Sequence, residues 1–435
     1  MPLNGPCQLD VRQVLTPPCP DALARTRCGS LRPVSPRTRN ALLTLGIVAL
    51  AFNLRPAAVS IGPVLDDIRH GLGMSGSEAG VLTSLPIIAF AVFGGLAPRL
   101  ARWLGPHRLT LVALLCVVVG LFSRSRVDGV VAFLALSLLA LAGMATANVL
   151  IPSLIKQHFP GRVGTMTAAY TTSLAVGLTS ASVLTVPVGA ALDGWRSGLM
   201  VWSLTAAVAV LPWVALVRED RAPEEEEEPA TPIRLADVAR TRLGWMMALF
   251  FGLQSVQAYS IFGWFADIYH DAGFSSGTAG LLLGVTTAVS IPTSFVVPAL
   301  AARLRHVTWL VVGFFCCYVV GYLGLAVAPA EGALVWAVLV GLGTATFPLV
   351  LTLIGLRART APGTAALSGF TQSVGYLIAA VGPFLVGVLH DLSDGWTVPL
   401  LALAALTVPL LVSGLAISRT VYLEDQLRPR QPSQP

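Results

Sequence analysis

Long apolar segments follow one another at short intervals from residue 41 to residue 418. Each segment has roughly the 20 residues that a helix needs to cross about 30 Å of hydrocarbon. The pattern therefore predicts an all-α membrane protein with twelve membrane-spanning helices. We place them at residues 41–65, 78–98, 108–127, 129–155, 163–190, 198–217, 243–267, 277–302, 306–328, 332–356, 362–390 and 396–418.

The polar segments between these helices differ in their content of arginine and lysine. With the N-terminus inside, the inside segments and span ends hold 23 of the 28 basic residues and the outside segments and span ends hold four, among them Arg124, leaving Arg55 alone deep within a span. Cytoplasmic loops of membrane proteins are enriched in basic residues. The sequence therefore predicts a multi-pass protein of the cell membrane with both termini in the cytoplasm.

The two halves of the chain resemble each other. DIRHGLGMSGSEAGVL at 67–82 and DIYHDAGFSSGTAGLL at 267–282 are identical at eight of sixteen positions, and VGAALDGW at 188–195 matches VGVLHDLSDGW at 386–396 with small slips. Six helices per repeat, an even number, leave both copies in the same orientation. We therefore expect two six-helix bundles related by a pseudo-two-fold axis along the membrane normal.

This repeat divides the chain into five parts. We expect a disordered cytoplasmic tail at 1–39, bundles at 40–218 and 243–418, a cytoplasmic linker at 219–242 and a second tail at 419–435. The linker contains five consecutive glutamates between prolines. Like charges in such a run repel and extend the chain, which favours a solvated hinge over a cation site.

Composition excludes several other classes of protein. Charged residues make up only 11% of the chain, against about 25% in soluble domains. The net charge of +6 is spread over loops beside anionic lipid, so we expect no nucleic-acid partner. The six cysteines have no paired spacing and no nearby histidine cluster, which predicts no disulfide framework, metal site or cofactor. The spans contain no HExxH or GxSxG motif, so we expect no enzymatic activity.

Several ordered motifs resemble those of one family. They are NLRPA at 53–57, GMATANVLIPSLIKQHFP at 143–160, GLQSVQAYSIFGW at 252–264, LTLIGLRART at 351–360 and LSGFTQSVGYLIAAVGPFLVGVLHD at 367–391. With the twelve spans and the repeat, they resemble the major facilitator superfamily, and within it the cyanate/2-nitroimidazole transporter (CynX/NimT) family. The resemblance runs from about residue 41 to 415 and implies a secondary transporter of small, often anionic or polar organic solutes. One departure is GGLAPRLARWLGPHR at 94–108, which lacks the acidic residue of the superfamily's loop signature.

Arg55 is the most unusual residue of the spans. An arginine at a helix centre costs roughly 2.5–3.5 kcal/mol on insertion scales. Pro56, which follows it, has no N–H to donate to the carbonyl of Phe52 and therefore predicts a kink. Within the predicted spans, Asp and Glu occur only as end residues, Glu78 and Asp267, so a bound anion could supply the missing partner. The alternative is a structural role, in which Arg55 hydrogen-bonds Asn53, freed carbonyls and water.

Other polar side chains fall on helical faces of further spans. Asn148 precedes Pro152 by one turn, Tyr170 belongs to a polar stripe on the fifth span, and Gln372 and Tyr376 share a face of the eleventh. The resemblance implies that such spans line or flank a central cavity. We therefore predict a solute-binding set of Arg55, Asn53, Asn148, Tyr170, Gln254, Gln257, Gln372 and Tyr376; hydrogen bonding between packed helices is the alternative for each of them.

Five charged or titratable residues near span ends are candidates for gating or coupling. Lys156, the only lysine, lies at an inside end and could anchor the headgroup region or take part in a gate. His70 and His270 each follow an aspartate by three residues, Asp67 and Asp267. Such a pair could couple transport to protons, or it could cap a helix or form an outer gate.

These features predict a secondary active transporter that moves a small anionic or polar organic solute, of the cyanate or nitroimidazole class, by alternating access. Its expected partners are the solute, the bilayer and a coupling proton, and we expect a monomer. One alternative is a drug or metabolite exporter of the same fold. Another is a transporter-like membrane sensor that binds solute without moving it.

Overall fold

The structure is a computed structural model that describes residues 36–192, 194–217 and 233–427. The described residues form helices joined by short turns and contain no strand, as the apolar pattern predicts. Most of the predicted N-terminal tail, most of the glutamate-rich linker and residues 428–435 lie outside the described residues.

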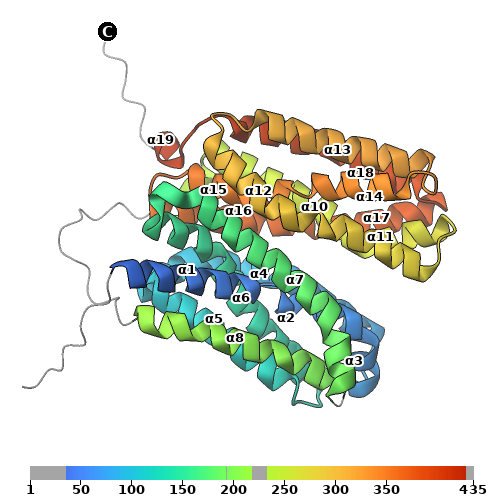
Figure 1. Ribbon diagram of the computed structural model, residues 1–435, viewed down its shortest axis with the longest axis horizontal. Helices are drawn as coiled ribbons and strands as arrows, with labels where there is room; N and C mark the ends of the chain where they lie inside the picture. The colour runs from blue at the N-terminus through green and yellow to red at the C-terminus, as the bar shows by residue number, and fades with distance from the viewer. Residues whose placement is uncertain (1–35, 193, 218–232, 428–435) are drawn as a thin grey trace, which may run out of the picture.

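The first half of the chain forms one bundle (Figure 1). Its long helices pack in the pairs α5 with α6 and α8, α4 with α6, and α1 with α7 and α8. A 3-10 turn, Gly62–Val64, joins α2 to α3, and another, Pro160–Arg162, joins α6 to α7. The helices are α1 (Pro36–Phe52), α2 (Pro56–Val59), α3 (Leu65–Leu72), α4 (Gly76–Leu104), α5 (Pro106–Arg124), α6 (Val130–His158), α7 (Val163–Ala191) and α8 (Trp195–Val217).

The second half forms a second bundle. In it α10 packs on α16, α18 and α11, while α13 packs on α14 and α18. The helices are α9 (Leu235–Ala239), α10 (Arg242–Asp271), α11 (Ser276–Ala288), α12 (Ser290–Arg303), α13 (Thr308–Val327), α14 (Ala333–Gly343), α15 (Thr346–Leu356), α16 (Ala361–Ala379), α17 (Val381–Ser393), α18 (Thr397–Ser418) and α19 (Leu423–Leu427).

Eleven segments of the described chain are helical, long and apolar enough to cross a membrane. They correspond to eleven of the twelve predicted spans. The remaining predicted span is α10, which has 30 residues and lies in the second bundle among the others. Its polar residues, among them Gln254, Ser255 and Gln257, make it less apolar than its neighbours.

Four of the spans are broken, and each break has the same cause. A proline cannot donate to the carbonyl four residues earlier. α1 ends at Phe52 and α11 at Ala288, each four residues before a proline, and α16 ends at Ala379, again four residues before one. α14 ends at Gly343, which precedes Pro348 by five residues instead of four. The predicted kink at Pro56 is thus a full break between α1 and α2.

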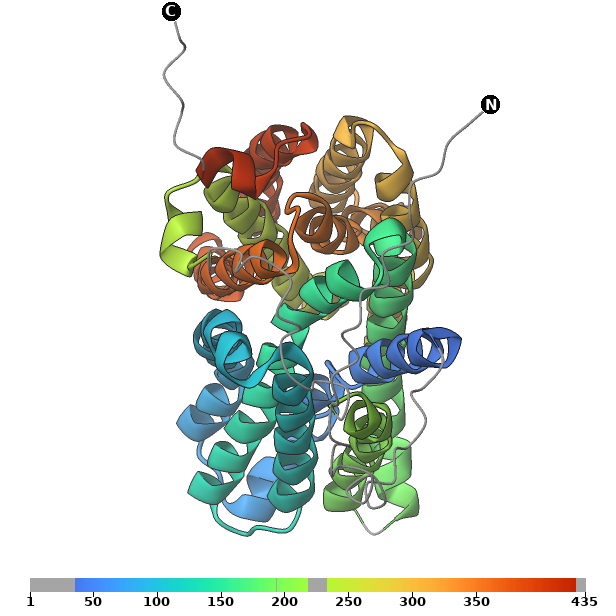
Figure 2. The ribbon, with the colours of Figure 1, turned by 90° about the vertical axis from the view of Figure 1, so that its left-hand side faces the viewer.

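The two bundles meet at one end of the molecule. We call it the linker end, because α8 ends and α9 begins there; the opposite end is the far end. The halves of the broken helices nearer the linker end, α12, α15 and α16, pack against α7, α6 and α4 of the first bundle. The other halves, α11, α14 and α17, pack within their own bundle. Figure 1 shows the bundles close together at the linker end and diverging toward the far end, and Figure 2 views them from the linker end.

The sequence repeat corresponds to a repeated turn at the far end. Gly73 and Gly273 follow the first and seventh spans with positive φ angles of 64° and 94°, a conformation that glycine adopts without steric cost. Ser75 and Ser275 then cap α4 and α11, since each side chain accepts a hydrogen bond from the backbone N–H three residues later. The repeated residues therefore specify the same helix–turn–helix connection in both bundles.

Part of the predicted C-terminal tail is folded. The five-residue helix α19 carries Glu424, whose carboxylate accepts hydrogen bonds from the backbone N–H groups of Arg359 and Thr360 and from the Thr360 hydroxyl. Asp425 forms an ion pair with Arg359 at 2.8 Å. These contacts hold α19 against the turn between α15 and α16 at the linker end.

Gly177 of α7 tests the packing around the break in the first span. A Cβ at this position would overlap the carbonyl oxygen of Phe52, the last residue of α1. We expect Gly177→Ala to destabilise the purified protein by about 1–3 kcal/mol, the usual cost of overpacking. Gly284→Ala is the matched control, because nothing lies within 4 Å of its added Cβ. Thermal unfolding of both variants in the same detergent would show the difference, and equal midpoints would contradict this packing.

Candidate functional site between the bundles

Arg55 lies at the break in the first span and faces the second bundle. It is the residue that precedes α2, and its side chain is partly exposed. Its guanidinium carbon lies 5.3 Å from the centroid of the Phe347 ring, a cation–π contact. Phe347 follows the break between α14 and α15, so each bundle contributes a residue from a broken helix.

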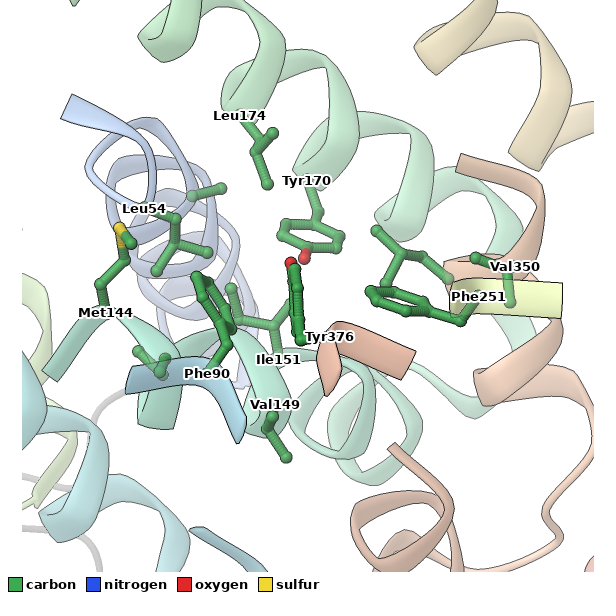
Figure 3. Close-up of a cluster of buried hydrophobic side chains, with 14 of the residues drawn as sticks. Leu54, Phe90, Met144, Val149, Ile151, Tyr170, Leu174, Phe251, Val350 and Tyr376 are labelled. Carbon is green, nitrogen blue, oxygen red and sulfur yellow. The ribbon is translucent and has the colours of Figure 1, made fainter. Parts of the chain in front are cut away.

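Aromatic side chains surround the guanidinium. Tyr376 lies within hydrogen-bonding reach of Arg55, and Tyr259 and Tyr170 lie near enough to interact with its charge. The Tyr376 ring also packs on Phe90, with centroids 4.3 Å apart, and on Phe251, at 5.1 Å. In Figure 3 the hydroxyl groups of Tyr170 and Tyr376 point toward the same place. The surroundings of Arg55 thus offer apolar ring faces and phenol hydroxyls, and no ion pair among the described residues gives it a carboxylate.

A chain of hydrogen bonds leads from this cluster across the boundary between the bundles. The Tyr170 hydroxyl donates to Asn148 Oδ1 at 2.8 Å, and Asn148 Nδ2 donates to Gln372 Oε1 at 2.6 Å. Gln372 Nε2 in turn donates to the Ser368 hydroxyl at 2.8 Å. All four side chains are buried. Three predicted site residues are therefore brought together, and they join α6 and α7 to α16.

Two further hydrogen bonds join the bundles toward the linker end. Ser153 Oγ on α6 donates to the Ala361 carbonyl at 2.8 Å. Thr171 Oγ1 on α7 donates to the Ser294 carbonyl at 2.6 Å. Together with the Asn148–Gln372 bond, they hold the two bundles together beside the aromatic cluster and on its side toward the linker end. The structure is therefore closed at the linker end.

Two predicted site residues have partners within their own bundle instead. Asn53 donates to the carbonyls of Ala49 and Thr205 and accepts from the Thr205 hydroxyl, so its amide ties the break to α8. Gln257 donates to the Leu403 carbonyl and accepts from the Tyr322 hydroxyl, which connects α10 to α18 and α13. The structure does not bring either amide to Arg55.

Gln254 differs from these two. It is buried, and its Nε2 donates to the neighbouring Ser255 hydroxyl at 2.6 Å. Its Oε1 is buried and has no hydrogen-bond partner. A buried acceptor without a donor costs free energy, so this amide keeps an unused acceptor. Its role in binding solute stays a prediction.

The predicted gating residues lie at the two ends of the molecule, away from Arg55. Lys156 is partly exposed in the last turn of α6, at the linker end. At the far end Asp67, His70, Asp267 and His270 are all exposed. His270 Nδ1 lies 3.8 Å from Asp271 Oδ1, the adjacent residue, and not on Asp267.

Two members of this site, Phe347 and Tyr259, are not among the residues predicted from the sequence. Each of them lies beside a feature that the sequence does show. Phe347 immediately precedes Pro348, and Tyr259 lies on the polar part of α10. Neither pattern says which face of a helix points toward the other bundle, and that depends on how the broken helices turn.

The fold and site together define a class of protein. Two repeated helical bundles, broken spans and a charged group between the bundles are features of secondary transporters with a site near the midplane. The molecule has a structural counterpart in a Major Facilitator Superfamily transporter, FucP, solved in the outward conformation. The TM-score is 0.70 at 14% identity, and the match covers 87% of this chain and 98% of that one.

Sequence comparison then places the chain in a family. The sequence model of the Major Facilitator Superfamily matches residues 41–383, so the chain belongs to this family. It is 36% identical to the uncharacterized transporter YycB of Bacillus subtilis strain 168, over 88% of this chain and 94% of the relative. The 2-nitroimidazole transporter of Escherichia coli K12 is 34% identical, covering 87% and 95%. The cyanate transport protein CynX of the same organism is 29% identical, covering 81% and 91%.

These comparisons confirm the family resemblance that the motifs carry and the expected fold. The relatives are transporters, and proteins of this family are generally not enzymes. With its apolar helices, the chain is a multi-pass membrane protein.

The hydrogen bond between Asn148 and Gln372 can be tested by a double-mutant cycle. Truncating either residue to Ala leaves a buried polar partner unsatisfied, which costs about 1–3 kcal/mol. We expect the double variant to lose clearly less stability than the sum of the two single losses, because the residues share one bond. Thermal unfolding in detergent measures all four proteins. Strictly additive losses would mean that the two amides do not interact.

Proposed function

We propose that the protein is a secondary active transporter that moves a small anionic or polar organic solute by alternating access, with Arg55 as the partner of the solute. The proposal rests on the surroundings of the Arg55 guanidinium. It lies between the bundles, its Nε is buried without a hydrogen-bond partner, and its side chain is partly exposed. A guanidinium forms its strongest contacts with planar oxygen acceptors such as carboxylates.

The surroundings of Arg55 support a solute with a flat, electron-rich body. Phe347 and Tyr376 offer ring faces, and the hydroxyls of Tyr259 and Tyr376 offer hydrogen bonds near the charge. The Tyr170 hydroxyl donates to Asn148 and can only accept from a solute. A site with few polar groups in fixed positions and apolar walls is typical of small-molecule recognition. The names of the relatives, a 2-nitroimidazole transporter and a cyanate transport protein, agree with solutes of this size and polarity.

Alternating access has a physical basis in the contacts between the bundles. The bundles are held at the linker end by a few side-chain hydrogen bonds and by packing of α7 on α12 and α4 on α16. Such contacts can be exchanged for contacts at the far end when the bundles rock about the site. The structure then represents the state closed at the linker end, and the orientation predicted from basic residues makes that end cytoplasmic.

The role of Arg55 is tested by transport in proteoliposomes. We expect Arg55→Gln to lose uptake of labelled 2-nitroimidazole, cyanate or 4-hydroxybenzoate, whichever of the three the unaltered protein accumulates; 4-hydroxybenzoate is included as a small aromatic carboxylate, the acceptor that a guanidinium binds best. A charge-assisted hydrogen bond contributes about 1.5–3 kcal/mol, so the loss should be about tenfold or more. Arg126→Gln is the matched control, because Arg126 is exposed and stacks on Phe122. Full transport by Arg55→Gln would refute the proposed role. Solute binding without accumulation by the unaltered protein would favour a sensor.

Orientation is tested at the two ends of helix α13. Glu331 is exposed in the turn at the far end, and His306 is exposed in the turn at the linker end. In a variant whose six cysteines are replaced by serine, we expect a membrane-impermeant maleimide to label Glu331→Cys in intact cells and His306→Cys only after lysis. The opposite pattern would place the linker end outside.

A further inference from the structure

A fully buried arginine lies beside the break in the first span. Arg124 is the last residue of α5 and its side chain is 0% exposed, whereas the sequence pattern assigns it to an outside loop. A guanidinium keeps its charge in proteins, and burying a charge is unfavourable unless its partners satisfy it well. No ion pair among the described residues gives Arg124 a carboxylate. Its hydrogen-bond partners must therefore account for its position.

Those partners all belong to the segment that follows Arg55. Arg124 Nη1 donates to the Ala57 carbonyl at 2.9 Å, and Nη2 donates to the Ser60 hydroxyl at 3.2 Å. The Ser60 hydroxyl in turn donates to the Pro56 carbonyl at 2.5 Å. The Arg124 guanidinium thus contacts the Ala57 carbonyl of α2 directly and the Pro56 carbonyl through the Ser60 hydroxyl.

The short helix α2 needs such support. It has four residues, and Arg55 precedes it without any side-chain cap. A helix this short has no stability of its own in water. Its Pro56 carbonyl accepts from the Ser60 N–H, whereas the last carbonyls of a helix lack helical partners. A positive charge at the C-terminal end of a helix also interacts favourably with the exposed carbonyls. The orientation of α2 therefore depends on Arg124, and α2 sets the direction in which Arg55 leaves the backbone.

We propose that Arg124 is a positioning residue for Arg55: it fixes α2 so that the Arg55 guanidinium stays over Phe347 and beside the three tyrosines. The inference rests on the proposed function, because it gives Arg55 the contact with the solute. Arg124 itself is not assigned a contact with the solute, since both of its Nη groups donate to Ala57 and Ser60. Lysine cannot replace it, because a single ammonium lacks the two parallel donors that reach Ala57 and Ser60.

The first test needs no solute. Phenylglyoxal modifies arginine side chains, and peptide mass spectrometry reports the rate at each position. In Arg124→Lys we expect Arg55 to be modified several-fold faster than in the unaltered protein, because α2 is no longer held. Exposed Arg99 of α4 should react at an unchanged rate, and Arg126→Gln should alter neither rate. Ser60→Ala removes one acceptor only and should give a smaller increase at Arg55.

The second test separates positioning from a merely structural role. It uses uptake of 4-hydroxybenzoate, 2-nitroimidazole or cyanate into proteoliposomes by Arg55→Gln, Arg124→Lys and the double variant. We expect Arg124→Lys to raise KM about tenfold while the maximal rate stays close to normal. In the double variant, Arg124→Lys should add little to the effect of Arg55→Gln, since it acts through that residue.

The outcomes distinguish this inference from the proposed function. If Arg55→Gln transports normally, the proposed function fails, whatever Arg124 does. If Arg55→Gln loses transport but Arg55 reacts with phenylglyoxal at an unchanged rate in both Arg124→Lys and Ser60→Ala, the positioning role is wrong. Additive effects in the double variant, or faster modification of every arginine alike, would also overturn it and indicate a general loss of stability.

Discussion

The burial of arginine charge in the first bundle is the constraint on which the rest of the structure depends. A guanidinium cannot lose its charge, and the described spans offer it no ion-paired carboxylate. Arg124 donates from its two Nη groups to a carbonyl and a hydroxyl of the broken first span, while its Nε has no partner. Arg55 is left with ring faces, phenol hydroxyls and an Nε without a partner. The break at Pro56 serves both residues, because it frees backbone acceptors for one and turns the other toward the second bundle.

In the proposed mechanism, the contacts between the bundles close the site on the side of the linker end. Where the bundles meet, buried amides and hydroxyls satisfy one another across the boundary, most directly in the bond between Asn148 and Gln372. Four of the spans are broken near prolines, which lets one half of a helix contact the other bundle while the other half stays with its own. Closure at the linker end therefore rests on contacts that short helical segments make.

Much of this arrangement can be predicted from the sequence. The length of the apolar segments predicts the membrane-spanning helices, and the internal repeat predicts the two bundles. Pro56, next to Arg55, predicts the break in the first span. The side to which a polar residue points is harder to predict. Asn53 and Gln257 lie on predicted polar faces, yet their amides bind Thr205 and Tyr322 within their own bundles. Arg124 stands at the end of a span, where a basic residue looks like part of a loop, and only tertiary packing shows that its side chain turns inward.

The central claim is that a solute supplies the missing partner of Arg55. The most direct measurement is an experimental structure of the protein bound to 2-nitroimidazole or 4-hydroxybenzoate. We predict that the oxygens of the ligand contact the Arg55 guanidinium and that the ring of the ligand packs against Phe347 and Tyr376. A ligand bound elsewhere, with Arg55 contacting only protein and water, would contradict it.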